Sequence, residues 1–296
     1  MSTFDEFIES TLLFTSGFSA SQEQVTSLVN PMTTGDTTLT VDDASVIPPT
    51  GLIEVGSELM WVKSVNTDTD VVTLAPFGRG YRGTVAAVHS VGDRVTAAPV
   101  VPRAAVERAV NDTIRGVYPL VFGVGTTEFT FNAAVDTYSL PAGAETVLGV
   151  WADTVGPTQE WMPVRRWTVN QSASPTDFAT GNSISLFDPI VPGRTVRVVY
   201  TQQPVALTAG DNFTDSGLRE AAEDLIRFGA ASRLVPWFEV ASAPGVAAEP
   251  NYAAAMGQRS SASATARYFT QMYQLRLQEE AGALQSLYPV RSHYTR

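Results

Sequence analysis

The chain has 296 residues, of which 44% are apolar, and this length allows two or three compact units with cores of their own. It carries 30 acidic and 19 basic residues, and the negative excess argues against a protein that wraps nucleic acid by neutralising phosphates. The sequence has no cysteine, which excludes disulfides, thiolate nucleophiles and zinc sites built on sulfur.

The first residues predict a short helix. In "STFDEFIESTLLF", Ser2 and Thr3 precede two acids, and apolar residues then recur on one helical face. We assign residues 1–30 to this helix and a linker. Because the start is acidic and no run of about 18 apolar residues occurs, we expect a soluble, unexported protein with no membrane partner.

Residues 31–100 show the two-residue alternation of β-strands, in "TTLTVDD", "GLIEVGSELMWVKSV", "DVVTLAPF" and "GDRVTAA". Proline, glycine and asparagine separate these runs. The length suits a small inserted β module, either barrel-like or a compact sandwich. The first 100 residues of the chain hold most of the acidic excess, with 12 acids and 4 basic residues.

Residues 101–296 are predicted to form a second domain that mixes helices and strands. A helix is expected over about 102–116, where Pro102 suits the first turn and Gly116 ends the pattern. Candidate strands separated by glycine turns follow over about 126–207 and predict a β-sandwich region. Helices are expected over about 216–235 and 260–288, with a tail over 289–296. The predicted fold class is α+β, with a core of N-terminal, central and two C-terminal helices.

The stretch "GRGYRG", Gly78 to Gly83, fits the GxGxxG spacing that lets backbone amides approach a dinucleotide. That chemistry needs a helix opening on the glycines, and "TVAAVHSVGDRV" is too short for a crossover helix before the next strand. We therefore expect a glycine-rich loop and no bound nucleotide.

Signals for catalysis are missing from the sequence. There is no GxSxG, and only two histidines occur, so nucleophile and base combinations are improbable. His89 is interpreted as a loop histidine bonded to backbone, with a metal ligand or a base as the alternatives. We expect no enzyme activity, no catalytic residues, no cofactor and no metal.

Aromatic residues allow two interpretations. Trp151, Trp161 and Trp167 fall within strand patterns and are expected in a sandwich core, although they could instead form a sugar-binding platform. Aromatic and apolar residues of the last helix are expected to pack against the 216–235 helix or a neighbouring subunit. The residues predicted for subunit packing are Ala266, Phe269, Met272 and Tyr273.

Several motifs resemble a known family. "GRGYRGTVAAVHSVGDRV" is similar to a loop of phage virion proteins. "RAAVERAVNDTIRGVYPLVFG" with its "YP" stop, the "YSLP" turn, and the closing "LREAAEDLIRFGAASRL" and "ARYFTQMYQLRLQEEAGALQSLYP" resemble the head-to-tail adaptors, or connectors, of tailed phages. The likeness covers residues 101–296 and contains no catalytic signature.

The resemblance implies a structural virion protein at the head-tail junction, made in the host cytoplasm. It implies a ring of 12 copies below the portal, a tail protein or nozzle underneath, and double-stranded DNA passing through without specific binding. It also implies that the terminal tail docks onto the portal, and the candidate docking residues are Arg291, His293, Tyr294 and Arg296. The alternative is a tail-tip or baseplate protein whose β module binds a host glycan or a tail fibre.

Overall fold

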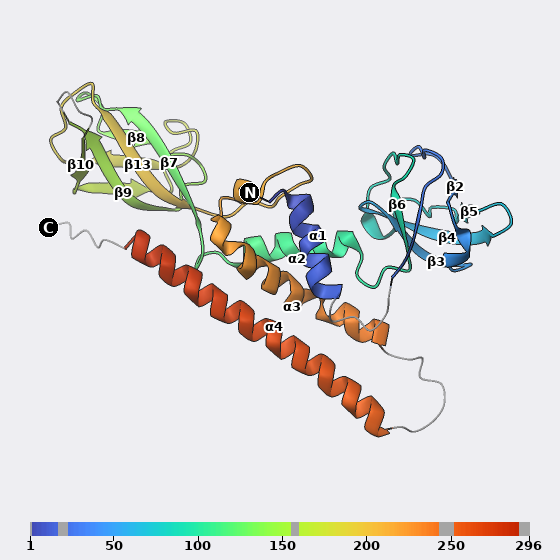
Figure 1. Cartoon of the computed structure of the whole chain (residues 1–296). Coiled ribbons are helices and arrows are strands. Elements are labelled where there is room, and N and C mark those ends of the chain that lie inside the picture. The colour runs from blue at the N-terminus through green and yellow to red at the C-terminus, as the bar shows by residue number, and fades with distance from the viewer. Residues whose placement is uncertain (1, 17–22, 155–159, 243–251, 290–296) are drawn as a thin grey trace. The chain divides into compact units, whose positions relative to one another are not determined.

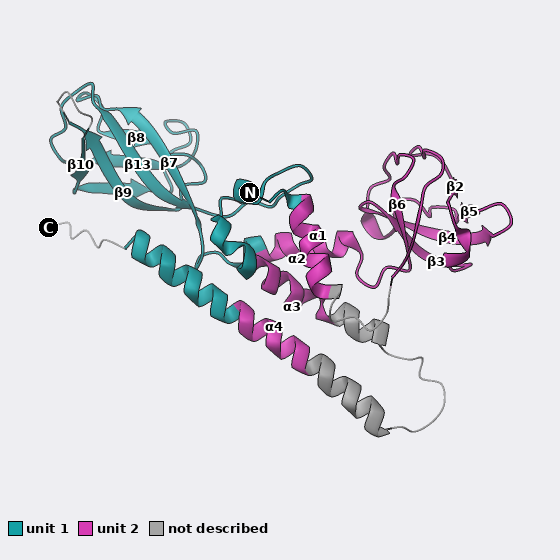
Figure 2. Ribbon diagram, viewed as in Figure 1, with its two compact units in different colours: residues 1–4, 114–225, 274–296 teal, residues 5–113, 226–273 magenta. Residues whose placement is uncertain are grey.

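A computed structural model describes residues 2–16, 23–154, 160–242 and 252–289 of the chain (Figure 1). The predicted α+β class is confirmed, since these residues form four α-helices and three sheets whose strands all pair antiparallel. The chain divides into two compact units (Figure 2). Residues 1–4, 114–225 and 274–296 form the first unit, and residues 5–113 and 226–273 form the second.

Two of the helices follow the sequence patterns closely. Helix α1 spans Phe4–Ser16 and buries the face that holds Phe7 and Ile8. Helix α2 spans Arg103–Gly116, and its buried side chains recur at intervals of three and four. These buried side chains of α2 are Val106, Ala109, Val110 and Ile114.

The last two helices differ from their predicted bounds. Helix α3 spans Glu223–Ser242, because the expected start at 216 is occupied by two short 3-10 turns, η3 (Phe213–Ser216) and η4 (Glu220–Ala222). Gly217, with a φ of +83°, ends the first turn. The helix then continues past Pro236, which removes one backbone hydrogen bond without ending it. Helix α4 spans Tyr252–Leu287 and starts before the predicted residue 260, since the alanines that follow Tyr252 favour helix.

The first sheet belongs to the β module and has the strand order β1-β6-β3-β4-β5-β2. Its core is made entirely of residues between Leu28 and Ala97. Strand β1 lies before residue 31, the predicted start of the module, and pairs with β6. The strands are β1 (Gln24–Ser27), β2 (Thr38–Thr40), β3 (Gly51–Val55), β4 (Glu58–Asn66), β5 (Val71–Leu74) and β6 (Arg94–Ala97).

The expectation of a barrel is not met in the described residues, because the six strands do not close. The two edge strands approach each other through a single bridge between Leu28 and Val41, just beyond the ends of β1 and β2. A 3-10 turn, η1 (Ala44–Val46), begins at Asp43, whose side chain accepts a hydrogen bond from the Ser45 backbone N–H. The module therefore consists of one six-stranded sheet that does not close, packed around one apolar core.

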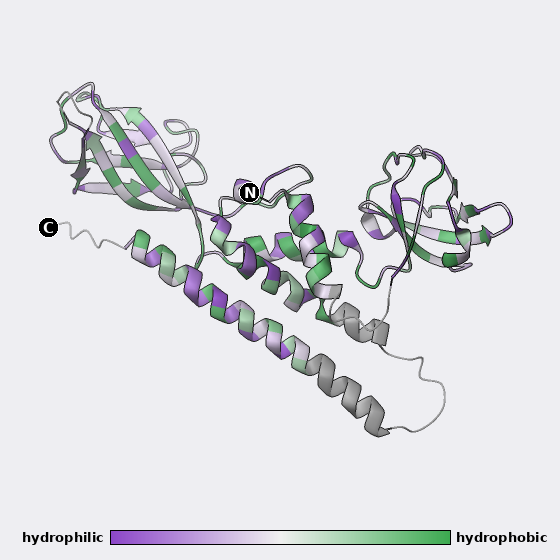
Figure 3. Ribbon diagram, viewed as in Figure 1, coloured by the Kyte–Doolittle hydropathy of each residue, from purple (hydrophilic) through white to green (hydrophobic). Residues whose placement is uncertain are grey.

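The second β region has two sheets that share one core, as expected for a sandwich. One sheet has the order β10-β9-β13-β7 and the other the order β11-β12-β8. Figure 3 shows apolar residues interrupted by polar ones along β13, where Val196, Val198 and Tyr200 are buried. The strands are β7 (Gly123–Thr130), β8 (Thr137–Ser139), β9 (Thr146–Asp153), β10 (Trp161–Val164), β11 (Trp167–Asn170), β12 (Ser183–Leu186) and β13 (Thr195–Gln202).

Candidate functional site

The four residues predicted to dock onto the portal, Arg291, His293, Tyr294 and Arg296, lie outside the described residues. The described part of the C-terminus ends with α4 and the two residues that follow it, Tyr288 and Pro289. The docking role of the tail therefore stays a prediction.

The residues predicted for subunit packing lie on α4, and one of them serves the fold of the single chain. Phe269 is completely buried and belongs to an apolar cluster with Ala231 and Val235 of α3. Its ring centroid lies 5.7 Å from that of Phe14, on α1. Ala266 is partly buried against the same cluster.

Tyr273 also contacts its own chain, and Met272 is partly buried. A Cβ placed on Gly229 would lie 2.9 Å from the Tyr273 ring and 2.3 Å from the Cγ2 atom of Thr113. Glycine is thus required where α2, α3 and α4 approach one another. Among the side chains described over residues 264–287 of this helix, the large apolar ones that are exposed are Tyr268, Leu275 and Leu287.

The glycines of "GRGYRG" are explained by loop geometry. A Cβ on Gly78 would lie 2.8 Å from the carbonyl oxygens of Ala75 and Trp61. Gly80 has a φ of +58°, and a Cβ there would lie 2.8 Å from the Thr84 oxygen. The stretch contains a 3-10 turn, η2 (Tyr81–Gly83), and leads to β6 without a crossover helix. The dinucleotide geometry is therefore absent from this described stretch.

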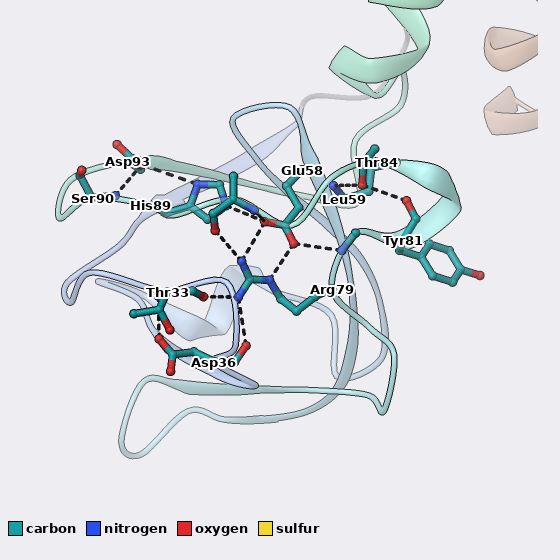
Figure 4. Close-up of polar contacts among 12 residues, drawn as sticks. Thr33, Asp36, Glu58, Leu59, Arg79, Tyr81, Thr84, His89, Ser90 and Asp93 are labelled. Atoms are coloured by element: carbon teal, nitrogen blue, oxygen red, sulfur yellow. Dashed lines mark hydrogen bonds and ion pairs between the residues drawn. The ribbon is translucent and has the colours of Figure 1, made fainter.

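A buried ion cluster at the base of this loop was not found by sequence reasoning (Figure 4). Glu58, at the start of β4, receives hydrogen bonds from Arg79 Nε at 2.6 Å and Arg79 Nη2 at 2.9 Å. The backbone N–H groups of Gly80 and Ala87 each donate to this carboxylate at 3.0 Å. His89 Nε2 lies 2.8 Å from Glu58 Oε2. One carboxylate therefore holds both ends of the loop.

Arg79 ties a second loop to the same cluster. Its Nη1 donates to the backbone oxygens of Thr33 at 2.6 Å and Asp36 at 3.0 Å, and its Nη2 donates to the Ala87 oxygen at 2.7 Å. His89 pairs through its backbone with Met32 in both directions, each at 2.9 Å. His89 lies in a loop as expected, but only its main chain pairs with backbone. Its imidazole contacts the Glu58 carboxylate, a partner that sequence reasoning did not predict.

The charge of Glu58 is stabilised by these donors. Burial by itself raises the pKa of the carboxyl, but the hydrogen bonds from Arg79, Ala87, His89 and Gly80 outweigh burial and lower the pKa to about 2. Every lone-pair direction is occupied by a protein donor, so the group has no proton to give and no free acceptor for a substrate. The cluster serves loop structure.

A second buried carboxylate lies where α2 begins. The backbone N–H of Arg103 donates to Glu54 Oε1 at 2.6 Å, while the Arg103 side chain pairs with Asp5, at 2.8 Å, and with Glu9 of α1. Burial raises the pKa of Glu54 to about 8, although the Arg103 N–H acts in the opposite direction. These contacts join α1 and β3 to the start of α2.

The tryptophans do not all lie in the sandwich core. Trp151 and Arg197 are opposite each other in the register of β9 and β13, so both side chains are on the outer face of that sheet. The Arg197 guanidinium lies 3.9 Å from the centre of the Trp161 ring and also pairs with Glu128 at 2.7 Å. Trp167 packs partly against the core. The outer face of the sheet is not packed against the core, so polar side chains are tolerated there. Arg197 covers the Trp161 ring on this face.

Metal-binding clusters and membrane-spanning helices are both absent from the part of the chain that the structure describes. No group of three or more His, Cys, Asp or Glu side chains with metal-binding geometry occurs there. Among those residues, no helix has the length and apolar character to cross a bilayer.

The sequence matches the model of a protein family. No curated protein matches the chain. The family described as SU10 adaptor protein matches residues 85–281, about two thirds of the chain. The match begins in the last part of the β module, shortly before His89, and ends within α4. It includes the helix with the "YP" stop and the "YSLP" turn. The chain therefore belongs to the SU10 adaptor protein family, and the resemblance to the head-to-tail adaptors of tailed phages is confirmed.

Proposed function

We propose that the chain is a structural virion protein that joins the portal to the tail in a ring of 12 copies and forms part of the DNA conduit. The match to the adaptor family over residues 85–281 carries this proposal. It supports a site in the virion at the head-tail junction, with synthesis in the host cytoplasm. The role requires no enzyme activity and no cofactor.

Helix α4 supports packing between copies. It has 36 residues and is about 54 Å long at about 1.5 Å per residue. Phe269 faces the chain's own helices, whereas Tyr268 and Leu275 are 44% and 49% exposed. A helix with apolar side chains on a second face can pack against the same helix of a neighbour, and such heterologous contacts repeat until a ring closes.

The charge of the chain supports a conduit. The net charge is −11, and a negative wall repels phosphates, so DNA slides past it without being held. The tail protein or nozzle attaches on the side away from the portal. In this proposal the C-terminal residues Arg291, His293, Tyr294 and Arg296 contact acids of the portal, because arginine and tyrosine contribute strongly to interfaces.

The domain organisation is also a proposal. We infer that the β module is inserted before an adaptor domain that begins near residue 101. The self-contained core of the module supports this division.

A second candidate function is a tail-tip or baseplate protein whose β module binds a host glycan or a tail fibre. The observation that favours it is an aromatic pair on the module, where the Trp61 and Tyr81 ring centroids lie 5.2 Å apart and Trp61 is 37% exposed. Both residues precede the region that matches the adaptor family.

Electron microscopy of the purified protein, alone and mixed with its portal, distinguishes the two functions. Twelvefold rings seated on the portal support the adaptor. Trimers that do not bind the portal, or binding to a glycan array through Trp61, would support the tail-tip protein and contradict the adaptor.

A further inference from the structure

A pocket of about 250 Å³ lies within the second unit, between the loop of the β module and the helices α2 and α3. Its walls contain three arginines from three elements: Arg82 of η2, Arg108 of α2 and Arg233 of α3. One acid, Asp112, also borders it, and Leu59 and Leu234 are among its apolar residues. The pocket is thus cationic in a chain whose net charge is −11.

Two arginines of the pocket differ from five other arginines of the chain that pair with an acid. Arg79, Arg103, Arg166, Arg197 and Arg276 each contact a carboxylate. Arg82 and Arg108, by contrast, form no ion pair with any residue in the described ranges. Two exposed guanidinium groups therefore retain their hydrogen-bond donors for a ligand.

The side chains are positioned by local structure. The Nη2 atom of Arg108 lies 3.5 Å from where a Cβ on Gly83 would stand, which places it beside the loop that carries Arg82. Arg233 Nε donates to Thr113 Oγ1 at 3.1 Å, and its Nη2 donates to the backbone carbonyl oxygen of Asp112 at 3.3 Å. The third guanidinium is thus tethered to α2.

The backbone of Arg82 provides an independent observation. Its φ is +55°, in the left-handed region that favours glycine, and yet the position holds an arginine. Its guanidinium carbon lies 5.7 Å from the centre of the Tyr81 ring. This backbone conformation and the ring contact define the position from which the guanidinium reaches the pocket.

We propose that this arginine pocket binds an acidic peptide segment of a protein partner, with aspartate or glutamate carboxylates held by Arg82, Arg108 and Arg233. Arginine pairs with a carboxylate through two parallel hydrogen bonds, and the apolar wall accommodates the aliphatic part of the segment. This site is separate from the proposed portal contact at the C-terminus and does not depend on it.

The charges favour a peptide over DNA. Duplex DNA carries one charge per about 1.7 Å of its axis and meets the repulsion of the whole acidic chain. A short segment with two or three carboxylates can enter the pocket and avoids most of that repulsion. Asp112 at the rim further disfavours a dense polyanion.

A fluorescein-labelled six-residue peptide of alternating glutamate and alanine, which carries three side-chain carboxylates, is measured by fluorescence anisotropy with the full chain at low salt. We expect saturable binding that weakens with salt. The variant Arg82→Gly with Arg108→Ala should bind at least tenfold more weakly. The control pair Arg94→Ala and Arg115→Ala removes the same two charges from exposed positions outside the pocket, and its binding should stay within twofold of the original protein.

Arg82→Gly alone separates binding from folding. It removes the guanidinium and relaxes the backbone, so the melting temperature should stay equal or rise while peptide binding falls at least threefold. Equal losses in both pairs of variants, or no binding to the original protein, would overturn the proposal. So would tighter binding of a labelled 20-base-pair duplex that depends on the same two arginines.

Discussion

The Nε atom of Arg79 lies 2.6 Å from Oε1 of Glu58, and their side chains are only 10% and 0% exposed. This pair joins the start of β4 to a loop that begins 21 residues later along the chain. Two backbone N–H groups and His89 also bond to the carboxylate. These hydrogen bonds offset most of the desolvation penalty of burying the pair. The pair therefore holds the loop that contains Arg79 against the start of β4.

Glu58→Gln should destabilise the protein by about 3–5 kcal/mol, because it leaves the buried Arg79 charge without its partner. Urea unfolding at pH 7 measures the difference. The matched control is Glu128→Gln, whose pair with Arg197 is 45% and 38% exposed, and it should cost about 1 kcal/mol or less. Equal costs for the two variants would contradict a structural role for the Glu58 cluster.

The advantage of Glu58 over glutamine should also depend on pH. The pKa of the carboxyl falls from 4.5 to about 2 on folding, so its contribution is complete above about pH 4.5 and is lost as the pH falls toward 2. Unfolding of the original protein and of Glu58→Gln at several acidic pH values measures this. A difference that stays constant from pH 7 to pH 2 would show that the charge is not responsible.

Glu54 should have the opposite dependence. Its pKa rises from 4.5 to about 8 on folding, so the unfolded chain loses the proton first, and stability falls as the pH rises through this window. Glu54→Gln keeps the acceptor for the Arg103 N–H and should become relatively more stable from pH 5 to pH 8, by a few kcal/mol at most. Chemical unfolding at both pH values checks the sign, and a variant that is less stable at pH 8 contradicts it.

Gly80→Ala should destabilise the module without any effect on nucleotides. The left-handed backbone costs about 1–2 kcal/mol for alanine, and the contact with the Thr84 oxygen adds about 1–3 kcal/mol. Gly56→Ala is the control, since Gly56 has a φ of +59° and nothing within 4 Å of the new Cβ. Thermal melting should rank the two variants in this order. Calorimetric heat with NAD or ATP on the original protein would contradict the loop interpretation.

The β module should fold alone. All the residues of its core lie between Leu28 and Ala97, so a fragment of residues 23–99 keeps every contact of that core. We expect a sheet-type circular dichroism spectrum and cooperative thermal unfolding. The module also contacts α2, for example through Ser57 and Glu107 at 2.6 Å. A fragment that unfolds gradually would show that such contacts are required.

Truncation after Tyr288 should weaken attachment to the portal and leave melting nearly unchanged, because it removes only the eight residues of the tail. The loss should be larger at low salt if the tail arginines pair with portal acids. Arg291→Ala with Arg296→Ala separates charge from length in the same pull-down or surface-binding measurement. If the truncated chain attaches as tightly as the full chain at both salt concentrations, the portal contact lies elsewhere.

Local patterns in the sequence were sufficient for the fold class and for α2. The apolar residues of α2 recur at three and four, Pro102 precedes it, and Gly116 ends it, so neighbouring residues contain the whole signal. The strands of both β regions were indicated by alternation in the same way. The motifs that resemble the adaptor family were also local, and the family match confirmed them.

Only the tertiary structure decided which distant groups meet. The partner of the loop residue Arg79 is an acid at the start of β4, and no spacing in the sequence distinguishes Glu58 from the other exposed or buried acids. Helix α3 continues past Pro236 to Ser242, although a proline after Val235 predicts a helix end there. The pocket of Arg82, Arg108 and Arg233 exists because a loop and two helices far apart in sequence fold together, and a long-range arrangement of this kind leaves no periodic signal.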